Sequence, residues 1–352
     1  MARQLKNVFD LNDIFYCARS TWDGRQFGDT FPQRFDWRNF EVEDANFDTG
    51  DVTMSEALAA SCNPFFYQMG ALLFRDRGPS TLTQYAQGMG LGQRTGFDFT
   101  DPREVAGQLE TPQGADAAIS QAIGQGNSQV TILQMARMVA AVANGGTLYE
   151  PYIVESVGNS SGELDYEATP DVAGQIPLSE RALTVVQDGM CMVPDSTVYG
   201  RSSGARLGTA WFAFSDPDWY PAPYTLCGKT GTAQTGRIEP NGWFVAYAPA
   251  DNPQIAVAAM IEHGREGSKR RPRIVRRILD AYFTCRGIRS RRSPNGGMRT
   301  STTRCRSLKA APAFSMDAAC VSSPRNPCVA WIGDERYAVH SPSLRSGVRF
   351  RG

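Results

Sequence analysis

The sequence predicts an α/β (α+β) fold in which an antiparallel sheet is covered by helices and joined to a mainly helical subdomain. Three strand-like segments follow one another at residues 224–229, 242–248 and 254–262, separated by Gly, Pro, Asn and Asp. Three strands in succession imply antiparallel pairing. Helical patterns come before and after these strands, and residues 50–150 are expected to supply the mainly helical part.

Signals for helix ends place the helices around this sheet. Thr131 with Gln134 three residues later has the form of a capping box, and an apolar stripe runs from there to an Asn-Gly-Gly stop at 144–146. Further helices are predicted at 179–192 and at 273–283, the second opened by a proline. Helices therefore both precede and follow the strands along the chain.

A pair of helices with a break between them is expected near residue 60. Ser55 is a candidate N-cap for the first helix, and Asn63, which precedes a proline, is a candidate N-cap for the second. Ser61-Cys62-Asn63 occupies the break, where side chains point away from the helical ladder. The first fifty residues have no sustained period, so loops and short elements are expected there.

Composition and charge limit the classes of function. The 352 residues are 41% hydrophobic and 20% charged, which is a globular composition sufficient for one large domain or two ordinary ones. The net charge of +0 provides no overall basic field, so no nucleic-acid partner is expected. The sequence contains no apolar run of the length that spans a membrane and no N-terminal secretory pattern. No anchor or signal is therefore predicted in this chain.

Charge is distributed unevenly along the chain. Residues 1–283 are acidic on balance, whereas residues 284–352 hold about thirteen Arg or Lys against three acidic residues. This last stretch is rich in Arg, Ser, Pro, Gly and Cys and has no periodicity, so little fixed structure is expected. We interpret it as a basic, disordered tail or as the product of an out-of-frame or chimeric reading.

The cysteines and histidines give no sign of a metal site. The eight cysteines show no Cys-x-x-Cys spacing, which argues against zinc and against a redox pair. Cys62 and Cys227 are interpreted as small core or loop residues. The two histidines, His263 and His340, do not form a ligand set. No metal and no cofactor is therefore predicted.

Two short motifs carry side chains that are useful for chemistry. Ser61 and Asn63 lie in the helix break, and Lys229-Thr230-Gly231 closes the first predicted strand. A strand that ends in Lys-Thr-Gly-Thr offers a cation, two hydroxyls and a backbone edge to an extended peptide that bears a carboxylate. Each motif alone is a weak signal, but their order and setting favour a functional site.

Lysine is rare in this chain, which gives the lysine of the second motif more weight. Of 36 basic residues only four are lysines, namely Lys6, Lys229, Lys269 and Lys309. Arg is the usual basic residue of this chain, but position 229 has Lys. This favours a specific need for a lysine there.

The two motifs resemble the second and third motifs of the penicillin-binding proteins and serine β-lactamases, whose first motif is Ser-x-x-Lys. The second motif is Ser61-Cys62-Asn63, and the third is Gly-Lys-Thr-Gly-Thr-Ala-Gln at 228–234. Three further stretches strengthen the resemblance, at 120–136, 208–210 and 241–249. Over about residues 5–283 the chain resembles the monofunctional, class B penicillin-binding transpeptidases, which implies the penicillin-binding transpeptidase/β-lactamase-like fold.

The resemblance implies three catalytic candidates. Ser61 would relay a proton to or from the leaving amine, and Asn63 would hold the substrate through its amide. Lys229 would raise the local positive potential. Each also has a structural interpretation, because Asn63 could serve only as an N-cap and Lys229 could be an ordinary lysine at a strand end.

The resemblance also implies three substrate-binding residues in the third motif. Thr230 and Thr232 would bind the terminal carboxylate of a D-Ala-D-Ala stem peptide. The backbone N–H of Thr232 would be one donor of the oxyanion hole, and the nucleophilic serine would supply the other. Gly231 would let the substrate approach the strand edge closely.

The family's Ser-x-x-Lys motif does not occur in this sequence. The positions three residues before the four lysines hold Arg3, Leu226, Glu266 and Arg306. In the family the motif lies upstream of Ser-x-Asn, so we expect it to have been lost before Met1 together with the membrane anchor and N-terminal domain. Loss of the nucleophile costs on the order of a millionfold in kcat in well-studied proteases. No turnover is therefore expected for the chain alone. In the family the Ser-x-x-Lys helix is central to the helical part, so only marginal stability is expected without it.

The resulting domain prediction is a partial transpeptidase domain at 1–283 and a basic tail at 284–352. The resemblance implies a parent protein on the extracytoplasmic face of the bacterial cell membrane, with roles in cell-wall synthesis and cell shape. Peptidoglycan stem peptides and β-lactams would be its ligands, and a membrane glycosyltransferase is a candidate partner.

Three other functions are compatible with parts of the sequence. A non-catalytic, transpeptidase-like binding module would need no nucleophile. A serine β-lactamase is disfavoured by the long separation of Ser61 and Lys229. Gly-Arg-Ser-Ser-Gly at 200–204 matches the nucleophile elbow of α/β-hydrolases, but no strand is predicted before it and no helix after it.

Overall fold

A computed structural model describes the backbone of most of the chain up to residue 289 and of two short strands beyond it. The described residues are 10–31, 33–41, 48–97, 104–159, 163–215, 222–236, 239–263, 270–289, 321–323 and 326–332. Side chains of 40–41, 270–271, 285–289 and the last two segments lie outside the description.

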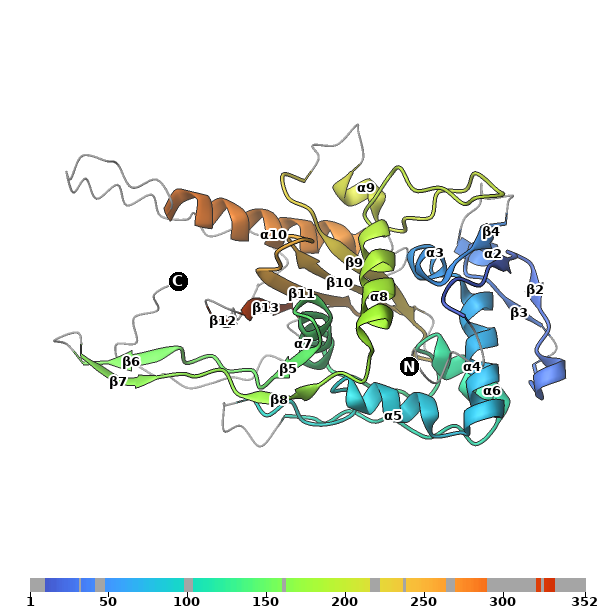
Figure 1. The fold of residues 1–352 in the computed structure, drawn as a ribbon, viewed down its shortest axis with the longest axis horizontal. Helices are drawn as coiled ribbons and strands as arrows, with labels where there is room; N and C mark the ends of the chain where they lie inside the picture. Colours follow the sequence, from blue (N-terminus) through green and yellow to red (C-terminus); the bar gives the residue numbers. More distant parts are fainter. Residues whose placement is uncertain are drawn as a thin grey trace.

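A five-stranded sheet forms the centre of the molecule. Its strand order is β12-β13-β11-β10-β9, with β9 at one edge (Figure 1). The strands span β9 Cys227–Ala233, β10 Asn241–Ala248, β11 Ile255–Ile261, β12 Val321–Ser323 and β13 Asn326–Ile332. The antiparallel pairing of β9, β10 and β11 confirms the prediction from their close succession.

Two features of the sheet differ from the sequence prediction. β13 pairs with β11 in parallel, so the sheet is mixed, and the long connection that contains α10 (Arg270–Arg289) is what permits a parallel crossover. β12 and β13 also come from residues 284–352, for which little fixed structure was expected. α10 also continues to Arg289, past the predicted helix end at residue 283, and the remainder of 284–352 lies outside the described residues.

The Lys-Thr-Gly motif lies within β9 and does not close the strand as predicted. Thr230 is opposite Phe244 of β10, and pairing continues to Ala233 opposite Asn241. The neighbouring strand decides this boundary. Ladder hydrogen bonds to β10 extend the strand through Gly231, although glycine has a low intrinsic strand preference.

Helices cover both faces of the sheet, as the helical patterns predicted. One face packs against α7 (Ile132–Ala143) and α8 (Glu180–Met192), and the other packs against α10 with α9 (Trp211–Phe214) close by (Figure 1). Alternate residues of β10 enter the two cores. The α7 side contains Val245 and Tyr247, and the α10 side contains Phe244, Ala246 and Ala248.

The capping box predicted for α7 is confirmed, and α8 forms within the predicted 179–192 span. The Thr131 hydroxyl accepts from the backbone N–H of Gln134, whose side chain accepts from the Thr131 N–H, so the capping box is complete. Ser179 caps α8 through the N–H of Ala182. The capping box is a local contact, which is why the sequence was sufficient to predict it.

The mainly helical part precedes α7 along the chain, as expected. It consists of α3 Met54–Ala60, α4 Asn63–Arg77, α5 Thr81–Gly88 and α6 Ala115–Ala122. α4 and α6 pack closely at Gly70, where an added Cβ would lie 2.6 Å from the Ala122 methyl and 2.9 Å from the Ala118 carbonyl oxygen. α3 packs against α8, which connects the helical part to the sheet.

The two predicted N-caps in this region were wrong. Thr53 caps α3 in a capping box with Glu56, whereas the Ser55 hydroxyl donates to the carbonyl of Val185 at 2.9 Å. Asn63 is the first residue of α4 and Cys62 precedes it as the N-cap. In each case a nearby residue supplies the cap. The predicted residue instead contacts a distant part of the chain, Val185 for Ser55 and Asp36 for Asn63.

The N-terminal part consists of short elements, as expected from its lack of period. They are β1 Phe15–Cys17, β2 Thr21–Trp22, a 3-10 helix at Arg25–Phe27, β3 Arg34–Phe35, α2 Arg38–Glu41 and β4 Gly50–Val52. Arg34 ties this part to α6, because its guanidinium binds both oxygens of Asp29 and also donates to the Ser120 hydroxyl and the Asp116 carbonyl. Arg34 therefore holds Ser120, the first residue of the 120–136 stretch, against the N-terminal part.

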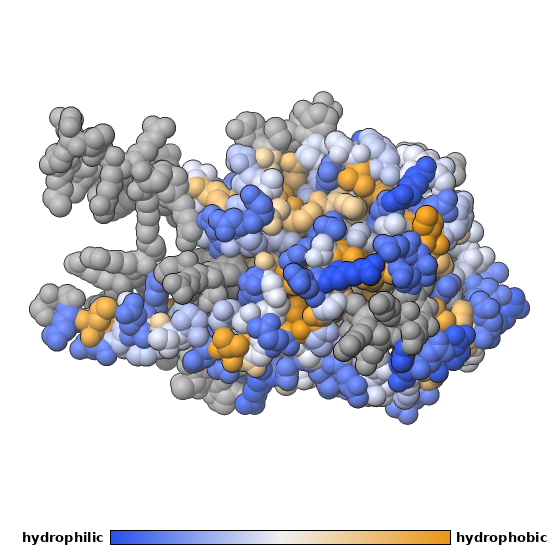
Figure 2. Space-filling view, in the orientation of Figure 1, coloured by the Kyte–Doolittle hydropathy of each residue, from blue (hydrophilic) through white to orange (hydrophobic). Residues whose placement is uncertain are grey.

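Two hairpin-like pairs form an arm that extends away from the body of the molecule (Figure 1). They are β5 Thr147–Tyr149 with β8 Val172–Gln175, and β6 Ser156–Gly158 with β7 Leu164–Glu167. Apolar side chains of the arm, Val157, Leu164 and Tyr166 among them, are exposed. Figure 2 shows such patches on the arm surrounded by hydrophilic surface.

Four cysteines form two disulfides, which the interpretation of Cys62 and Cys227 as small core or loop residues did not include. Cys17 is bonded to Cys62, and Cys191 is bonded to Cys227. Both predicted residues are fully buried, so the core assignment itself is confirmed. The partners are 45 and 36 residues apart, and sequence spacing alone does not reveal such pairings.

Within the described residues, no helix combines the length and apolar character needed to cross a bilayer. This agrees with the absence of a long apolar run in the sequence.

Truncation of Phe244 tests the central role of the double-sided sheet. Its ring is fully buried and stacks on Phe214, so Phe244→Ala is expected to lower the free energy of unfolding by about 3–5 kcal/mol. Urea unfolding measures this loss. The matched control Val172→Ala, in a side chain that is 60% exposed, should change stability little, and equal effects of the two variants would contradict this account.

Candidate active site

The backbone at Ser61 places its hydroxyl outside the helices. Ser61 is the C-cap of α3 and has the left-handed conformation φ 55°, ψ 39°. Glycine is the usual residue at such a position because a side chain costs energy there. A serine that accepts this cost is consistent with a need for its hydroxyl, and the predicted break between two helices is confirmed.

Lys229 of β9 brings Ser61 and the sheet together. Its Nζ lies 2.9 Å from Ser61 Oγ and 2.7 Å from the carbonyl oxygen of Thr230. The two residues are 168 positions apart in sequence, so the contact exists only in the folded chain. The structure therefore joins a hydroxyl and an amine, one from each of the two predicted motifs.

The environment of Lys229 shifts its proton equilibrium toward the neutral amine. Burial first, and then the positive charge of Arg38, together lower the pKa of Lys229 to about 8 from 10.5. The neutral amine therefore becomes accessible near neutral pH. An amine with this pKa can exchange a proton with the Ser61 hydroxyl, which is what general acid–base chemistry requires.

Residues 36–38 support the helix break from the side of the N-terminal part. The Asp36 carboxylate accepts from the backbone N–H of Asn63 at 2.9 Å, and the Trp37 indole donates to the Ala60 carbonyl at 3.2 Å. Arg38 lies over the Trp37 ring at 4.6 Å and pairs with Asp36 at 3.4 Å. Sequence reasoning missed this Asp-Trp-Arg segment, because it lies in a stretch without periodicity.

Thr230 has a partner from a third part of the chain. Its hydroxyl lies 2.8 Å from the hydroxyl of Thr209, a residue of the 208–210 stretch. Gly208 lies close to backbone, because an added Cβ would meet the Asp195 carbonyl oxygen at 2.5 Å and the Met192 carbonyl oxygen at 2.8 Å. The glycine therefore lets this loop approach the end of α8, and the loop presents Thr209 to β9.

The remaining residues of the third motif lie along the free side of β9. The carbonyl of Thr232 accepts from the side-chain amide of Gln125 at 2.8 Å, and the N–H of Gln234 donates to the other end of that amide at 3.1 Å. Gly231 faces Trp243 of β10, where an added Cβ would lie 3.1 Å from the Trp243 Cβ. A larger residue at 231 would thus be crowded by the neighbouring strand.

One group of side chains has the donor atoms that a metal would need. The sulfur atoms of Cys17 and Cys62 and a carboxylate oxygen of Asp36 lie within 4.8 Å of one another and are buried. Both sulfurs belong to the Cys17–Cys62 disulfide, and metals bind the thiolate form of cysteine. In the disulfide form this group is structural.

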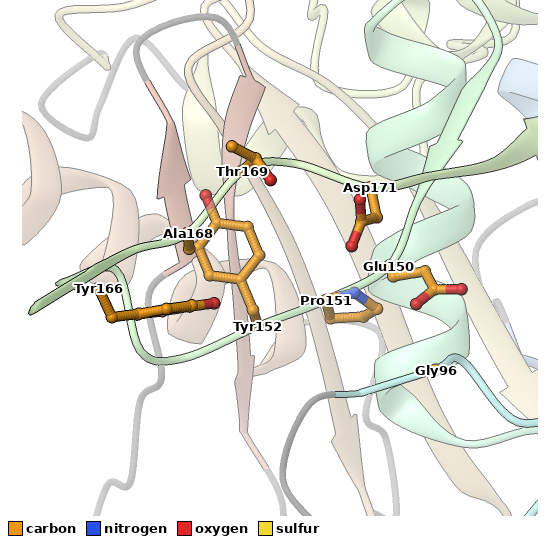
Figure 3. Close-up of a pocket in the computed structure, with 8 residues that line it drawn as sticks. All are labelled: Gly96, Glu150, Pro151, Tyr152, Tyr166, Ala168, Thr169 and Asp171. Carbon is orange, nitrogen blue, oxygen red and sulfur yellow. The ribbon is translucent and has the colours of Figure 1, made fainter. Parts of the chain in front are cut away.

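Two other features are separate from the Ser61–Lys229 contact. A small pocket of about 70 Å³ lies at the base of the arm, where Figure 3 shows Tyr152, Tyr166, Glu150 and Asp171 around it. In the 200–204 stretch, Ser202 accepts from the Asp51 N–H and Ser203 donates to the Thr49 carbonyl. These serines stabilise a turn against β4, in agreement with the low weight given to a nucleophile elbow.

The geometry defines a class of site, namely a hydroxyl and an amine next to a sheet edge that can bind an extended peptide. The chain belongs to the penicillin binding protein transpeptidase domain family, whose model matches residues 20–280. The motif-based resemblance and the predicted fold class are thereby confirmed.

Curated relatives agree with this family. The chain is 27% identical over 270 residues to the peptidoglycan D,D-transpeptidase MrdA of Haemophilus influenzae, covering 67% of this chain and 37% of that protein. It is 33% identical over 213 residues to penicillin-binding protein 2B of Streptococcus pneumoniae, covering 58% and 28%. The chain therefore spans less than two fifths of the length of these relatives.

Solved structures show the same fold. Penicillin-binding protein 2B of Streptococcus pneumoniae matches with a TM-score of 0.62 at 24% identity, covering 79% of this chain and 45% of that one. A chain from a structure described as coordinating polymerization and crosslinking by a peptidoglycan synthase complex matches with a TM-score of 0.59 at 26% identity, covering 84% and 45%.

Replacement of Lys229 tests its lowered pKa. Below pH 8 the amine is charged in the folded and the unfolded chain, so its burial opposes folding. Between pH 8 and 10.5 the folded chain loses the proton first, and wild-type stability rises with pH. The stability advantage of Lys229→Met at pH 7 should therefore shrink by up to about 3 kcal/mol at pH 10.5, at about 1.4 kcal/mol per pKa unit.

Urea unfolding at a series of pH values from 7 to 10.5 measures this difference. Ser61→Ala is the matched control, because it keeps the amine and should retain the rise in stability with pH. Parallel pH profiles for wild type and Lys229→Met would show that the pKa of Lys229 is unshifted.

Proposed function

We propose that residues 1–283 form part of a peptidoglycan D,D-transpeptidase domain that binds the D-Ala-D-Ala end of a stem peptide along β9. The observation that carries the proposal is the 2.9 Å contact between Lys229 Nζ and Ser61 Oγ beside the edge strand. Family membership and the names of the relatives support it. The stretch 284–352 is proposed to be a basic segment, of which β12 and β13 extend the central sheet beside β11.

Each predicted site residue has a proposed role in this function. Ser61 relays a proton to or from the leaving amine through Lys229, whose pKa of about 8 suits the exchange. Asn63 holds the substrate through its amide. The hydroxyls of Thr230 and Thr232 bind the terminal carboxylate, with Lys229 supplying positive potential.

The backbone of β9 would supply the rest of the binding surface. The Thr232 N–H is proposed as one donor to the developing oxyanion. The peptide lies against an edge strand, where main-chain hydrogen bonds provide affinity. Gly231 is proposed to let the substrate approach the strand edge closely.

We propose that this chain by itself does not form an acyl-enzyme, because Ser-x-x-Lys does not occur in its sequence. Mechanistically, a hydroxyl that only relays protons does not replace the nucleophile. The parent protein is proposed to act at the extracytoplasmic face of the bacterial membrane, with a membrane glycosyltransferase as partner. The relative described within a peptidoglycan synthase complex supports such a partnership.

Labelling with fluorescent penicillin tests the loss of acylation. The chain is expected to remain unlabelled, because a covalent penicilloyl bond needs the serine of Ser-x-x-Lys. Protein that carries an upstream Ser-x-x-Lys segment from the same locus should become labelled, and its Ser→Ala variant should not. Labelling of the chain as given would overturn the proposed inactivity and point to Ser61 or another serine.

A second candidate function, peptide binding without acylation, is favoured by the same absence of Ser-x-x-Lys beside an otherwise assembled site. Reversible binding of a D-Ala-D-Ala peptide combined with absence of labelling, even after the upstream segment is supplied, would support this function over the transpeptidase.

A further inference from the structure

The outer edge of β9 offers a defined set of backbone groups. β9 pairs only with β10 in the described sheet, so its other side is an edge. Successive residues of a strand direct their N–H and C=O groups to opposite sides. The Thr232 carbonyl and the N–H of Gln234, the residue that follows β9, point outward, because both bind Gln125. Thr230 has the same orientation as Thr232, because the two are two residues apart.

Gln125 already occupies one position of this edge. Its Nε2 donates to the Thr232 carbonyl at 2.8 Å, and its Oε1 accepts from the Gln234 N–H at 3.1 Å. A side-chain amide has the same donor and acceptor as a peptide group. The Gln125 side chain therefore forms the two hydrogen bonds that one residue of an added strand would form.

We propose that Gln125 is a gate on the peptide-binding edge of β9, and that an extended ligand must displace its side-chain amide to pair with Thr232 and Gln234. The inference rests on the proposed function, since it assumes that the ligand is a peptide lying along β9. The gate also protects the edge in the free protein, because unpaired strand edges tend to pair with other chains.

The surroundings of Gln125 allow its side chain to move while its backbone stays fixed. The Gln125 N–H donates to the Ser120 carbonyl at 3.0 Å, and Ser120 is in turn held by Arg34. Gly124 and Gly126 flank it with φ of 74° and 83°, and apart from chain neighbours no atom lies within 4 Å of where a Cβ would be on either glycine. The two flanking residues therefore carry no side chain that would confine the Gln125 amide against β9.

The gate sets a length threshold for ligands. A ligand that reaches only the Thr230 and Thr232 hydroxyls does not compete with Gln125. A longer ligand that pairs with the Thr232 carbonyl and the Gln234 N–H exchanges its own peptide hydrogen bonds for those of Gln125. Only ligands that extend past Thr232 must therefore break the two hydrogen bonds of the Gln125 side chain.

Binding of two probes to the full chain tests the gate. The long probe is diacetyl-L-Lys-D-Ala-D-Ala and the short probe is N-acetyl-D-alanine, both measured by NMR titration. In Gln125→Ala the long probe should bind about threefold to tenfold more tightly, the size of a net neutral hydrogen bond, while the affinity of the short probe stays unchanged.

Hydrogen exchange of the Gln234 amide gives a second readout that a purely structural role would not change in the same way. In the wild type this N–H is bound to Gln125, so Gln125→Ala should accelerate its exchange. The long probe should restore slow exchange in the variant, because it takes over the same N–H. The matched control is Gln113→Ala, an exposed glutamine bonded only locally to the Thr111 carbonyl, which should leave both readouts unchanged.

The outcomes separate the gate from the function on which it rests. Unchanged or weaker binding of the long probe to Gln125→Ala, with the short probe still bound, would overturn the gate and leave the proposed function intact. Absence of binding of both probes to the wild type and to all variants would overturn the proposed function and the gate with it.

Discussion

The hydrogen bond between Lys229 and Ser61 is the contact on which the candidate site depends, because it joins the helical part of the molecule to the sheet. The Ser61 hydroxyl lies next to Lys229 because Ser61 itself ends α3 in the left-handed conformation. The Lys229 amine is placed there because β9 continues through the Lys-Thr-Gly motif. Packing of α3 on α8, and of α8 on β9, holds the two ends at this distance. A change in either packing would separate the hydroxyl from the amine.

The buried amine opposes folding and serves function at the same time. Burial and the charge of Arg38 lower the pKa of Lys229, so the neutral form becomes available near neutral pH. The same burial makes the charged form unfavourable, and a marginally stable domain retains only about 5–15 kcal/mol with which to tolerate it. Perturbed groups of this kind gather at functional sites, which agrees with the family to which the chain belongs.

The edge of β9 brings the proposed function and the proposed gate together. Strand β10 holds one side of β9, while Thr209, Gln125 and Lys229 contact its hydroxyl and carbonyl groups on the site side. Gln125 and Thr209 come from other parts of the chain, whereas Lys229 belongs to β9 itself. The edge is thus enclosed by side chains at the same groups that a peptide ligand would use.

Local patterns in the sequence were enough to predict the α+β class, the capping box of α7, the span of α8, the antiparallel strands and the two motifs, because each depends on neighbouring residues. They did not predict that Thr53 and Cys62 take the N-cap positions, that β13 pairs in parallel, or that Cys17 bonds to Cys62. Residues 36–38 and Gln125 were likewise assigned no role at the site. Only the tertiary structure decided these features, since each depends on contacts between residues far apart in the chain, which a local pattern does not encode.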